Sequence, residues 1–367
     1  MAASGRSLRC PVLITGGAGF VGTNLAARLL ANGERVRIFD SLVRPGVQEN
    51  IAWLQDSHPG AVDFVQADVR NSSAVAAAME GVEHVVHLAA QVAVTKSLVS
   101  PTLDFDVNAL GTLNVLEAAR RSPRPPSLLF TSTNKVYGEL ADLRVQADGE
   151  RYVPLEERVR ARGVDETRCL DFHSPYGCSK GAAEQYVLDY SRSFGLRTTV
   201  FRMSCIYGPH QHGNEDQGWV AHMARRAMAG GPITIYGDGK QVRDVLFVED
   251  LVEAFALARR HIGKLRGRAF NIGGGPGNTV SLLELINRLE ELLDRRVELA
   301  FDDWRVGDQR YYVSDTSKFG AATGWRARTD VERGLLALCD WFRGEEHSTQ
   351  PALAPVAAAA LPLSAQG

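Results

Sequence analysis

The N-terminal half of the chain alternates between short apolar runs and segments in which apolar residues recur at helical spacing. The apolar runs predict strands at 11–15, 35–39, 62–67, 84–89, 127–132 and 198–202. The periodic segments between them predict helices at 21–32, 73–80, 104–121 and 176–194. Strands that alternate with helices form right-handed crossovers, so the pattern predicts an α/β fold with a doubly wound parallel sheet.

Two features interrupt this alternation. Residues 138–173 are charged and lack a strong period, and so long a connection usually serves a function or contains small elements of its own. After residue 202 the predicted elements become shorter and mixed. We predict a first domain at 1–202, a smaller C-terminal substrate-binding α/β domain at 203–343, and a disordered tail at 344–367. Within 245–272, the segments 247–260 and 269–272 would return to the first domain.

Composition narrows the functional classes. The 367 residues include 45% apolar and 23% charged residues, with 41 basic against 43 acidic side chains and a net charge of −2. This balance gives no electrostatic reason to expect nucleic acid or an anionic membrane as a partner. The N-terminus lacks the apolar run of a signal peptide, and no stretch approaches the roughly 18 apolar residues of a membrane span. The scattered cysteines lack zinc-like spacing, so we expect reduced thiols, no metal site and a cytoplasmic location.

A glycine-rich turn follows the first predicted strand, in Pro-Val-Leu-Ile-Thr-Gly-Gly-Ala-Gly-Phe-Val-Gly at 11–22. Gly16 allows a tight turn, Gly19 lets the backbone approach a pyrophosphate, and Gly22 lets the helix pack closely on the strand. The N-terminus of that helix offers free N–H groups to phosphates. The turn therefore predicts a Rossmann-type dinucleotide site.

Asp40 ends the second predicted strand, where a carboxylate can accept hydrogen bonds from both ribose hydroxyls. Such a carboxylate would repel the extra phosphate of NADP, so we expect NAD; Arg37 and Arg44 are the argument for NADP. The alternative role of Asp40 is that of a solvated turn residue, and the alternative role of Asp68 is that of a helix N-cap. His87 is expected to be packed within its strand. Further cofactor contacts are expected at Phe20, Val21, Ser41, Asp68, Val69, Leu88, Ala89 and Ala90.

Tyr176 and Lys180 have the spacing Tyr-x-x-x-Lys, which puts both side chains on one face of a helix. A lysine ammonium and an oxidised nicotinamide ring would favour the phenolate, moving the tyrosine pKa from about 10 toward the range of a general base. Thr133, at the end of a predicted strand, offers a hydroxyl to the same substrate oxygen. A bare Tyr-x-x-x-Lys occurs by chance, but here it follows the glycine turn and the acid in order. Asn108 is expected to support the cofactor site by a hydrogen bond, and a plain helix polar residue is the alternative.

With these motifs the chain resembles the extended short-chain dehydrogenase/reductase family over about residues 10–343. The resemblance is carried by Thr-Ser-Thr-Asn-Lys-Val-Tyr-Gly at 131–138, Asp-Phe-His-Ser-Pro-Tyr-Gly-Cys-Ser-Lys-Gly-Ala-Ala-Glu-Gln-Tyr at 171–186, Asp-Gln-Gly-Trp-Val at 216–220 and Gly-Lys-Gln-Val-Arg-Asp-Val-Leu at 239–246. It implies a nucleotide-sugar epimerase with tightly bound, recycled NAD. Tyr176 would take the proton of a sugar hydroxyl while the carbon gives up a hydride, which returns to the other face of the keto-sugar. The resemblance alone places this reaction at C2.

Dehydratases of this family carry Asp-Glu directly after the active-site threonine. Asn134 and Lys135 stand there in this chain and cannot act as that acid/base pair, which argues against dehydration. The remaining alternatives are a 4-epimerase or other redox epimerase of a UDP- or dTDP-sugar, an NAD(P)-dependent reductase, and a cofactor-sensing protein with a dead site. The intact set of Thr133, Tyr176 and Lys180 argues against the last.

The second predicted domain should bind the nucleotide diphosphate. Arg243 is the first candidate for the pyrophosphate because a guanidinium matches phosphate oxygens; Arg310 is the second, with Asp308 orienting it. Cys205 replaces the asparagine that is common in the wider family, which argues against a uridine-type binding mode. The other expected substrate residues are Asn134, Lys135, Ser204 and Gln217.

Two further expectations concern a loop and a surface. His210 and His212 lack a third placed ligand, so we expect the loop 209–216 to shape the sugar pocket rather than hold a metal, with a plain surface loop as the alternative. Members of the family commonly pair through the two helices beside the site, here 104–121 and 176–194. Their apolar residues would serve a homodimer or homotetramer, or simply the core.

Overall fold

The computed structural model describes residues 12–305 and 307–349. Its centre is a seven-stranded sheet in the order β12-β8-β5-β4-β1-β2-β3, in which every pair of neighbours is parallel. The strands are β1 (Val12–Thr15), β2 (Val36–Asp40), β3 (Val62–Gln66), β4 (His84–His87), β5 (Ser127–Thr133), β8 (Thr198–Met203) and β12 (Arg268–Ile272). Their apolar runs suit strands that are covered on both faces. The predicted Rossmann-type sheet is confirmed.

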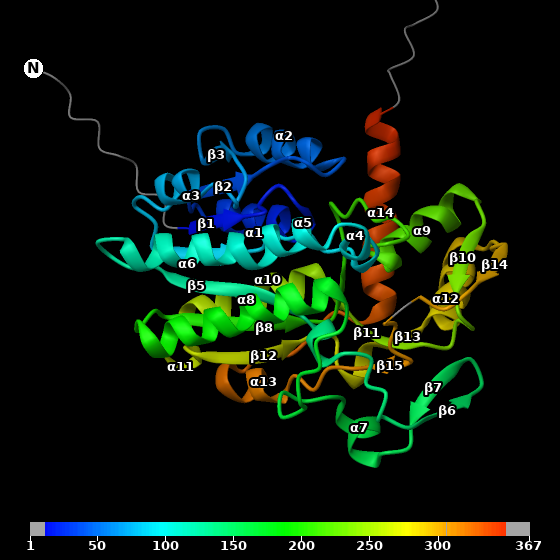
Figure 1. The fold of residues 1–367 in the computed structure, drawn as a ribbon. Coiled ribbons are helices and arrows are strands. Elements are labelled where there is room, and N and C mark those ends of the chain that lie inside the picture. The colour runs from blue at the N-terminus through cyan, green and yellow to red at the C-terminus, as the bar shows by residue number, and fades with distance from the viewer. Residues whose placement is uncertain (1–11, 306, 350–367) are drawn as a thin grey trace, which may run out of the picture.

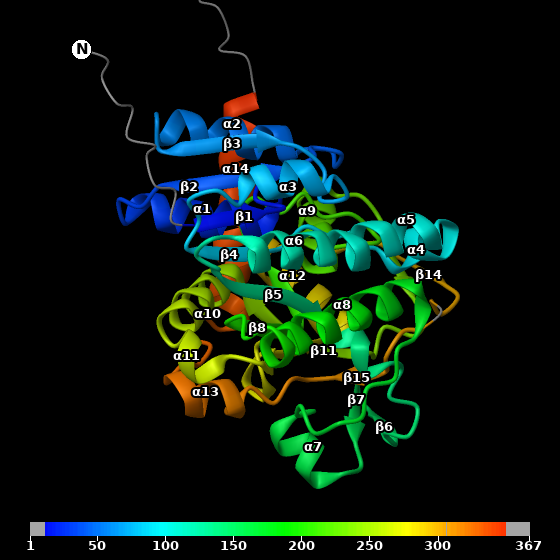
Figure 2. The ribbon, with the colours of Figure 1, turned by 60° about the vertical axis from the view of Figure 1, so that its left-hand side comes forward.

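Helices cover both faces of this sheet and give three layers (Figure 1, Figure 2). One apolar cluster contains α1 (Phe20–Ala31), α2 (Val47–Ser57), α10 (Val248–Arg260) and α13 (Ser317–Thr323). The cluster on the other face contains α3 (Ser72–Ala78), α6 (Gly111–Arg121) and α8 (Ser174–Ser193). The sequence analysis did not predict α2, although its buried Val47, Ile51 and Leu54 have helical spacing.

The helix predicted at 104–121 is interrupted. It consists of α5 (Pro101–Phe105), a π-helical turn η1 (Asp106–Leu110) and α6, and α4 (Val94–Val99) precedes it. Asn108 lies in the π-helical turn and bonds through its side chain to the backbone of Gln91, after β4. π-Helical turns often occur at functional sites, and this one is bonded to α8 (Ser174–Ser193) through Asn108 and Ser179.

The segment 138–173 contains small elements of its own, one of the two outcomes expected for so long a connection. They are the antiparallel hairpin of β6 (Val145–Asp148) and β7 (Arg151–Pro154), followed by α7 (Glu157–Arg162). A separate apolar cluster joins this insertion to Val242 and Tyr312. The 3-10 turn η2 (Asn134–Tyr137) leads from β5 into it.

The rest of the chain forms a second group of elements with its own apolar cluster. Its strands are β9 (Cys205–Tyr207), β10 (Ile233–Tyr236), β11 (Val242–Phe247), β13 (Thr279–Ser281), β14 (Leu299–Asp302) and β15 (Tyr311–Tyr312). Its helical segments are α9 (Trp219–Ala229), α12 (Leu282–Leu293), α14 (Val331–Thr349) and the 3-10 turn η3 (Pro276–Asn278), while α11 (Ile262–Leu265) connects α10 to β12. Both α10 and β12 pack with the first group. The exact domain boundary stays a prediction.

The predicted tail starts too early. The backbone of α14 stays helical to Thr349, beyond the predicted start at residue 344. An ion pair between Arg225 and Glu345 joins this part of the helix to α9, which the sequence pattern did not reveal. Residues 350–367 lie outside the described residues.

Other expectations concern helices, thiols and metal ions. Across the described ranges, no helix is long and apolar enough to cross a membrane. Cys169, Cys178, Cys205 and Cys339 are unpaired, and Cys10 lies outside the described residues. Among residues 12–305 and 307–349 no group of three or more His, Cys, Asp or Glu side chains is placed to hold a metal ion.

Candidate active site

The glycine turn forms a cradle between β1 and α1. At Gly16, whose φ is +70°, a Cβ would lie 2.7 Å from the backbone nitrogen of Ala89. A Cβ at Gly22 would lie 2.5 Å from the Cα of Gly17, so α1 packs directly on the turn. At Gly19 a Cβ would meet only the carbonyl oxygen of Gly16, at 3.2 Å, which leaves its other side open. Because the backbone is exposed beside the N-terminus of α1, the cradle fits the pyrophosphate of a dinucleotide.

Asp40 lies at the end of β2, beside this cradle. One carboxylate oxygen accepts a hydrogen bond from the Ala18 backbone at 3.1 Å, and the other accepts one from the Leu42 backbone at 2.9 Å. Burial raises the pKa of Asp40, and these backbone donors and Arg44 act in the opposite direction. The carboxylate, with Ser41 after it, is therefore fixed at the strand end, where a ribose would bind.

The two arginines that argued for NADP are both engaged elsewhere. Arg37 pairs with Asp63 at 2.7 Å and donates to the carbonyls of Ala78 and Glu80, each at 2.8 Å. Arg44 donates to the side chain of Gln217. Because both guanidinium groups are engaged in this way, neither offers a ready site for a 2′-phosphate beside Asp40. This favours NAD over NADP.

Residues after the ends of β4 and β3 pack against glycines near the proposed cofactor site. The Leu88 nitrogen donates to Thr15 at 3.0 Å, and the backbone of Ala89, followed by Ala90, passes directly over Gly16. Val69 packs on Gly111, where a Cβ would lie 2.7 Å from the valine side chain.

Asp68 and His87 also lie at strand ends. Asp68 pairs with Arg70 at 2.7 Å, and Asn71 rather than Asp68 caps α3. His87 is fully buried between Thr15 and Thr112, and burial lowers its pKa to about 3. This histidine is a neutral packed residue, as expected.

Thr133, Tyr176 and Lys180 meet where β5 ends and α8 begins. Tyr176 is 8% exposed and Lys180 3% exposed. Burial raises the pKa of Tyr176 to about 12, and a hydrogen bond with Thr133 acts in the opposite direction. Burial also lowers the pKa of Lys180 to about 7, and its Nζ lies 4.1 Å from the centre of the Phe130 ring.

The expected pKa shift of Tyr176 is therefore wrong for the chain's own groups. Lys180 faces an aromatic ring and is not among the groups that lower the tyrosine pKa, so burial dominates. The geometry, by contrast, agrees with the motif: a threonine, a tyrosine and a lysine converge at one strand end.

Asn108 connects the π-helical turn to this site. Its side chain accepts from the Gln91 nitrogen at 2.8 Å and donates to Asp104 at 3.1 Å and to Ser179 at 3.0 Å. Ser179 precedes Lys180 on α8. Asn108 therefore supports the catalytic helix through other residues.

Asn134 continues the site after Thr133. Its side chain accepts from the Thr133 hydroxyl at 3.3 Å and donates to Gln309 at 3.3 Å. Gln309 is 0% exposed and donates to the Gly138 carbonyl at 2.6 Å. Sequence reasoning missed Gln309; its position between the two predicted residues Asp308 and Arg310 was the available signal.

Arg243 and Lys135 share one carboxylate. Asp308 lies 2.7 Å from the Arg243 guanidinium and 3.5 Å from Lys135 Nζ. Burial raises the pKa of Asp308, but the two cations outweigh it and the net pKa is lowered. Arg310 is exposed, with its guanidinium 5.6 Å from the Tyr152 ring centre and 5.7 Å from that of Trp304. The expectation that Asp308 orients Arg310 is wrong, because Asp308 orients Arg243.

Two other expected substrate residues are engaged away from this cluster. The Ser204 hydroxyl donates to the backbone oxygen of Asp244 at 3.0 Å and to its carboxylate, in a buried group that also includes Ser314. Gln217 accepts from Arg44, on the dinucleotide side. Cys205 accepts from the Trp219 indole at 3.3 Å.

The loop 209–216 contacts the first group of helices. Asn24 of α1 donates to the Pro209 carbonyl at 2.9 Å, and Asn50 of α2 donates to the His210 carbonyl at 3.4 Å. The Trp53 and His210 rings lie 4.3 Å apart. These contacts join the loop to the helices beside the dinucleotide cradle, and its role in shaping the sugar pocket stays a prediction.

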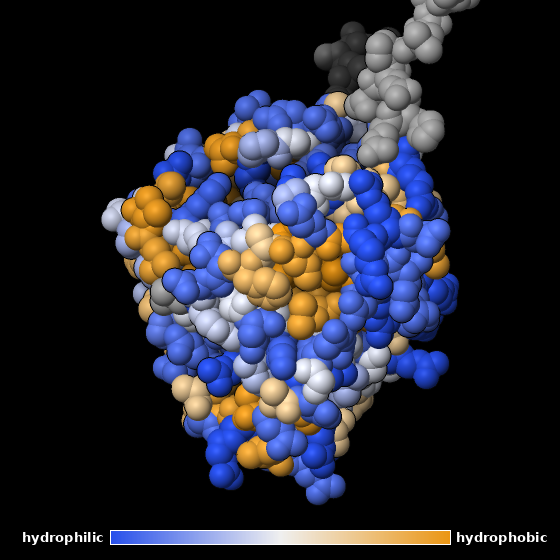
Figure 3. Space-filling model, turned by 90° about the vertical axis from the view of Figure 1, so that its right-hand side faces the viewer, coloured by the Kyte–Doolittle hydropathy of each residue, from blue (hydrophilic) through white to orange (hydrophobic). Residues whose placement is uncertain are grey.

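Figure 3 shows the side of the molecule on which the second group of elements lies, and there an apolar area is bordered by polar residues. The groups available for chemistry at the carboxyl ends of the strands are Thr133 and Tyr176, together with Arg243, which Asp308 holds in place. The set can hold a polyphosphate, align a sugar hydroxyl and transfer its proton.

Comparisons with known proteins agree with this site. The model of the NAD dependent epimerase/dehydratase family matches residues 12–273. CDP-paratose 2-epimerase of Salmonella typhi is 42% identical over 337 residues, covering 90% of this chain and 98% of that protein. A putative UDP-glucose 4-epimerase of Methanocaldococcus jannaschii is 30% identical over 338 residues, covering 92% and 100%. Among solved structures, UDP-glucose 4-epimerase of Thermus thermophilus in complex with NAD is 35% identical with a TM-score of 0.76, covering 91% of this chain and 99% of that one.

Proposed function

The chain belongs to the NAD dependent epimerase/dehydratase family, and on that premise we propose that it inverts C2 of a CDP-activated sugar, converting CDP-paratose into CDP-tyvelose. The observation that carries the proposal is the full-length similarity to the Salmonella typhi CDP-paratose 2-epimerase. This similarity exceeds that to the putative UDP-glucose 4-epimerase over a comparable length.

The cofactor is NAD, and the cradle of Gly16, Gly19 and Gly22 with Asp40 would hold it. When bound, NAD supplies reversible uptake of a hydride at the sugar carbon, so none is consumed. Further contacts are proposed at Phe20, Val21, Ser41, Asp68, Val69, Leu88, Ala89 and Ala90.

Tyr176 is proposed to take the proton of the C2 hydroxyl and to return it after inversion. Its buried phenol has a raised pKa, so a nearby positive charge must lower that pKa when the site is filled. Thr133 would form a hydrogen bond with the same oxygen. Lys180, whose own pKa is lowered to about 7, would keep the surroundings of the transferred proton polar. A positioned general base contributes roughly 10²–10⁴ in rate.

Arg243 is proposed to bind the pyrophosphate. Its guanidinium is already oriented by Asp308, and a fixed guanidinium fork loses little entropy when it binds phosphate. Arg310 would contribute from the rim, where it is exposed. Asn134 and Lys135, fixed by Gln309 and Asp308, would contact the sugar.

The second candidate is a 4-epimerase of a UDP- or dTDP-sugar, favoured by the solved UDP-glucose 4-epimerase structures that share this fold. A dehydratase is disfavoured because Asn134 and Lys135, rather than carboxyl side chains, directly follow Thr133. A net reductase would consume its cofactor in proportion to product, which separates it from both epimerases.

The test is proton NMR of CDP-paratose incubated with the purified protein and no added cofactor. We expect a C2 epimer to appear while total sugar stays constant. Inversion of UDP-glucose at C4, with CDP-paratose left unchanged, would reject the first candidate in favour of the second. No turnover of either sugar would reject both.

We also propose that the chain forms a homo-oligomer through α4, η1 and α8. Exposed apolar side chains gather on these and adjacent segments at Leu98, Val99, Leu103, Phe105, Leu110 and Tyr186. Such a row favours association with a second copy. Light scattering should give a multiple of the chain mass that Phe105→Lys reduces, and a monomeric wild-type protein would contradict this.

We propose a cytoplasmic location. The four described cysteines are unpaired, which suits a reducing compartment.

A further inference from the structure

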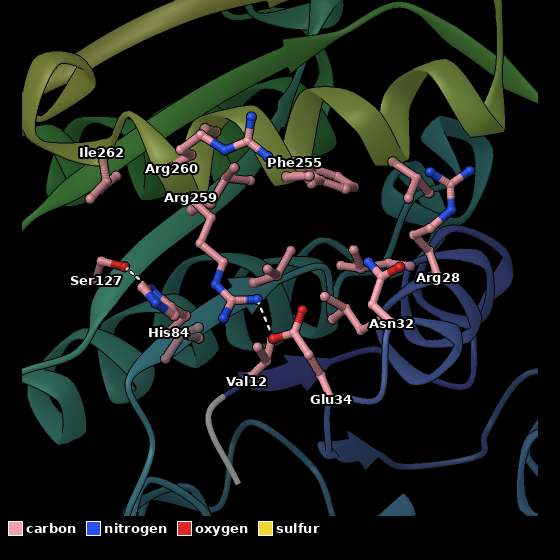
Figure 4. Close-up of a pocket in the computed structure, with 18 residues that line it drawn as sticks. Val12, Arg28, Asn32, Glu34, His84, Ser127, Phe255, Arg259, Arg260 and Ile262 are labelled. Atoms are coloured by element: carbon pink, nitrogen blue, oxygen red, sulfur yellow. Dashed lines mark hydrogen bonds and ion pairs between the residues drawn. The ribbon is translucent and has the colours of Figure 1, made fainter. Parts of the chain in front are cut away.

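A cavity of about 270 Å³ lies at the amino ends of β1, β4 and β5, between α1 and α10 (Figure 4). Its lining includes Val12, His84 and Ser127, the first residues of these three strands. Because parallel strands all begin at one edge of a sheet, this cavity is at the edge opposite Thr133 and the glycine cradle. It is therefore separate from the candidate active site.

The walls of the cavity are apolar. They are formed by Leu25 and Leu29 of α1, Leu129 of β5, and Val252 and Phe255 of α10. Open space lined by such side chains forgoes the packing contacts that would otherwise stabilise the core. A concave apolar site with a few converging polar groups is typical of small-molecule binding.

The rim of the cavity is cationic. Arg28, Arg259 and Arg260 line the border together with one carboxylate, Glu34, and only Arg259 is paired with it. Figure 4 shows Arg259 reaching across the cavity to Glu34, and the two charged groups are 2.6 Å apart. No ion pair or side-chain hydrogen bond joins Arg28 or Arg260 to another residue within the described ranges.

His84 adds polarity without charge. Its Nδ1 lies 2.6 Å from the Ser127 hydroxyl, and burial lowers its pKa to about 4. At neutral pH the side chain is uncharged, so the excess positive charge comes from the arginines alone. These arginines lie in the last turns of α1 and α10, where cations also favour the helix dipoles. If the arginines only stabilised the helix dipoles, neither the cavity nor its apolar walls would be needed.

We propose that this cavity binds a small amphipathic anion, with an apolar body against α1 and α10 and one anionic head group at Arg259. The volume lies just below the range of ordinary ligand pockets, about 300–1,000 Å³, which excludes a nucleotide sugar or a dinucleotide. The head group takes the place of Glu34 as the partner of Arg259. The inference is independent of the reaction at the other edge.

The first experiment is calorimetric titration of the full chain, with its bound NAD, with octanoate as the probe. Octanol tests the apolar body alone, and inorganic sulfate tests the charge alone. We expect saturable binding of octanoate that is at least about tenfold tighter than that of either control, because both parts of the site must be used. Equal binding of octanol, or no octanoate binding up to its solubility, would overturn the proposal.

Variants separate a ligand site from a structural ion pair. Ala256→Leu, on α10 beside the cavity, should abolish octanoate binding by filling the space. Arg259→Gln should weaken binding about tenfold, whereas Glu34→Gln should strengthen it because the competing carboxylate is gone. Arg192→Gln, an exposed arginine of α8, is the matched control and should change nothing.

The opposite signs at Arg259 and Glu34 are the decisive readout. If the pair only stabilises the fold, both substitutions lower the thermal midpoint and neither changes octanoate binding in the folded protein. That result, or an Ala256→Leu protein that binds octanoate normally, would reject the site.

Discussion

The two edges of the central sheet differ in how their polar groups are arranged. At the carboxyl edge, Thr133, Asn134 and Gln309 bond to one another in series. At the amino edge, apolar walls surround open space and arginines stand with few partners. In the candidate active site a neighbouring residue holds each polar side chain in place. In the cavity at the amino edge, charged side chains remain available to a ligand.

Strand β4 connects both edges and shows the contrast within one element. His84 begins the strand beside the cavity and His87 ends it beside the cradle. Both are uncharged at neutral pH, because burial lowers the pKa of His84 to about 4 and that of His87 to about 3. His87 is bonded on both ring nitrogens, by Thr15 and Thr112, and His84 on one.

The largest effect is expected at the carboxyl edge from Tyr176→Phe. Loss of the phenolic proton carrier should lower kcat by about 10³-fold, since a positioned general base contributes that much. Bound NAD, measured by absorbance after denaturation, should remain at the wild-type amount. Turnover within tenfold of the wild type would show that another residue carries the proton.

Gly22→Ala should be the next most damaging change. Its Cβ would lie 2.5 Å from backbone of the turn, and such overpacking costs about 1–3 kcal/mol. We expect a lower thermal midpoint and loss of bound NAD. Gly263→Ala is the control, because a Cβ there meets nothing within 4 Å. Equal NAD content in both variants would contradict the cradle.

Arg243→Lys should raise KM about tenfold with little change in kcat, because an ammonium cannot make the two parallel bonds of a guanidinium. Arg310→Lys should have a smaller effect, since that side chain is exposed on the rim. Steady-state kinetics of both variants, with Arg333→Lys as an exposed control, checks the order. A larger effect at Arg310 would reverse the two assignments.

The smallest expected effect is the pH dependence of stability, which involves histidines at both edges of the sheet. A histidine with a lowered folded pKa stays neutral while the unfolded chain takes up a proton below about 6.5, so stability falls with pH from that value toward the folded pKa. Fully buried His87 should contribute a slope of roughly 1 kcal/mol per pH unit between pH 6 and 4, measured by urea unfolding. His87→Gln should flatten that slope. NMR titration should show His84 protonating before His87 on acidification, and the reverse order would contradict the comparison.

At the carboxyl edge, the sequence predicted well those residues that bind one ligand together, because that ligand requires a fixed spacing between them. The glycine turn, Asp40 and the set of Thr133, Tyr176 and Lys180 all lie where the motifs placed them, at one edge of the predicted sheet. The common edge of parallel strands and the four-residue spacing that puts Tyr176 and Lys180 on one helix face explain why: local spacing fixes these positions.

The remainder depends on contacts between distant segments. Asp308 pairs with Arg243 rather than Arg310, and Ser204 with Asp244, because strands β9, β11 and β15 lie side by side in space. The cavity arises only where α1 and α10 approach, and no motif encodes it. The spacing of residues within one helix or strand predicts which of them contact the same ligand. It does not predict pairs of residues that come together only when distant segments pack.

The measurement that tests the central claim most directly is the fate of deuterium placed on C2 of CDP-paratose during turnover in ordinary water. If inversion proceeds by oxidation at C2 and return of the same hydride, the CDP-tyvelose product keeps its deuterium at C2. Loss of the label to water would contradict the account, because inversion would then proceed by exchange of a C2 proton rather than by transient oxidation.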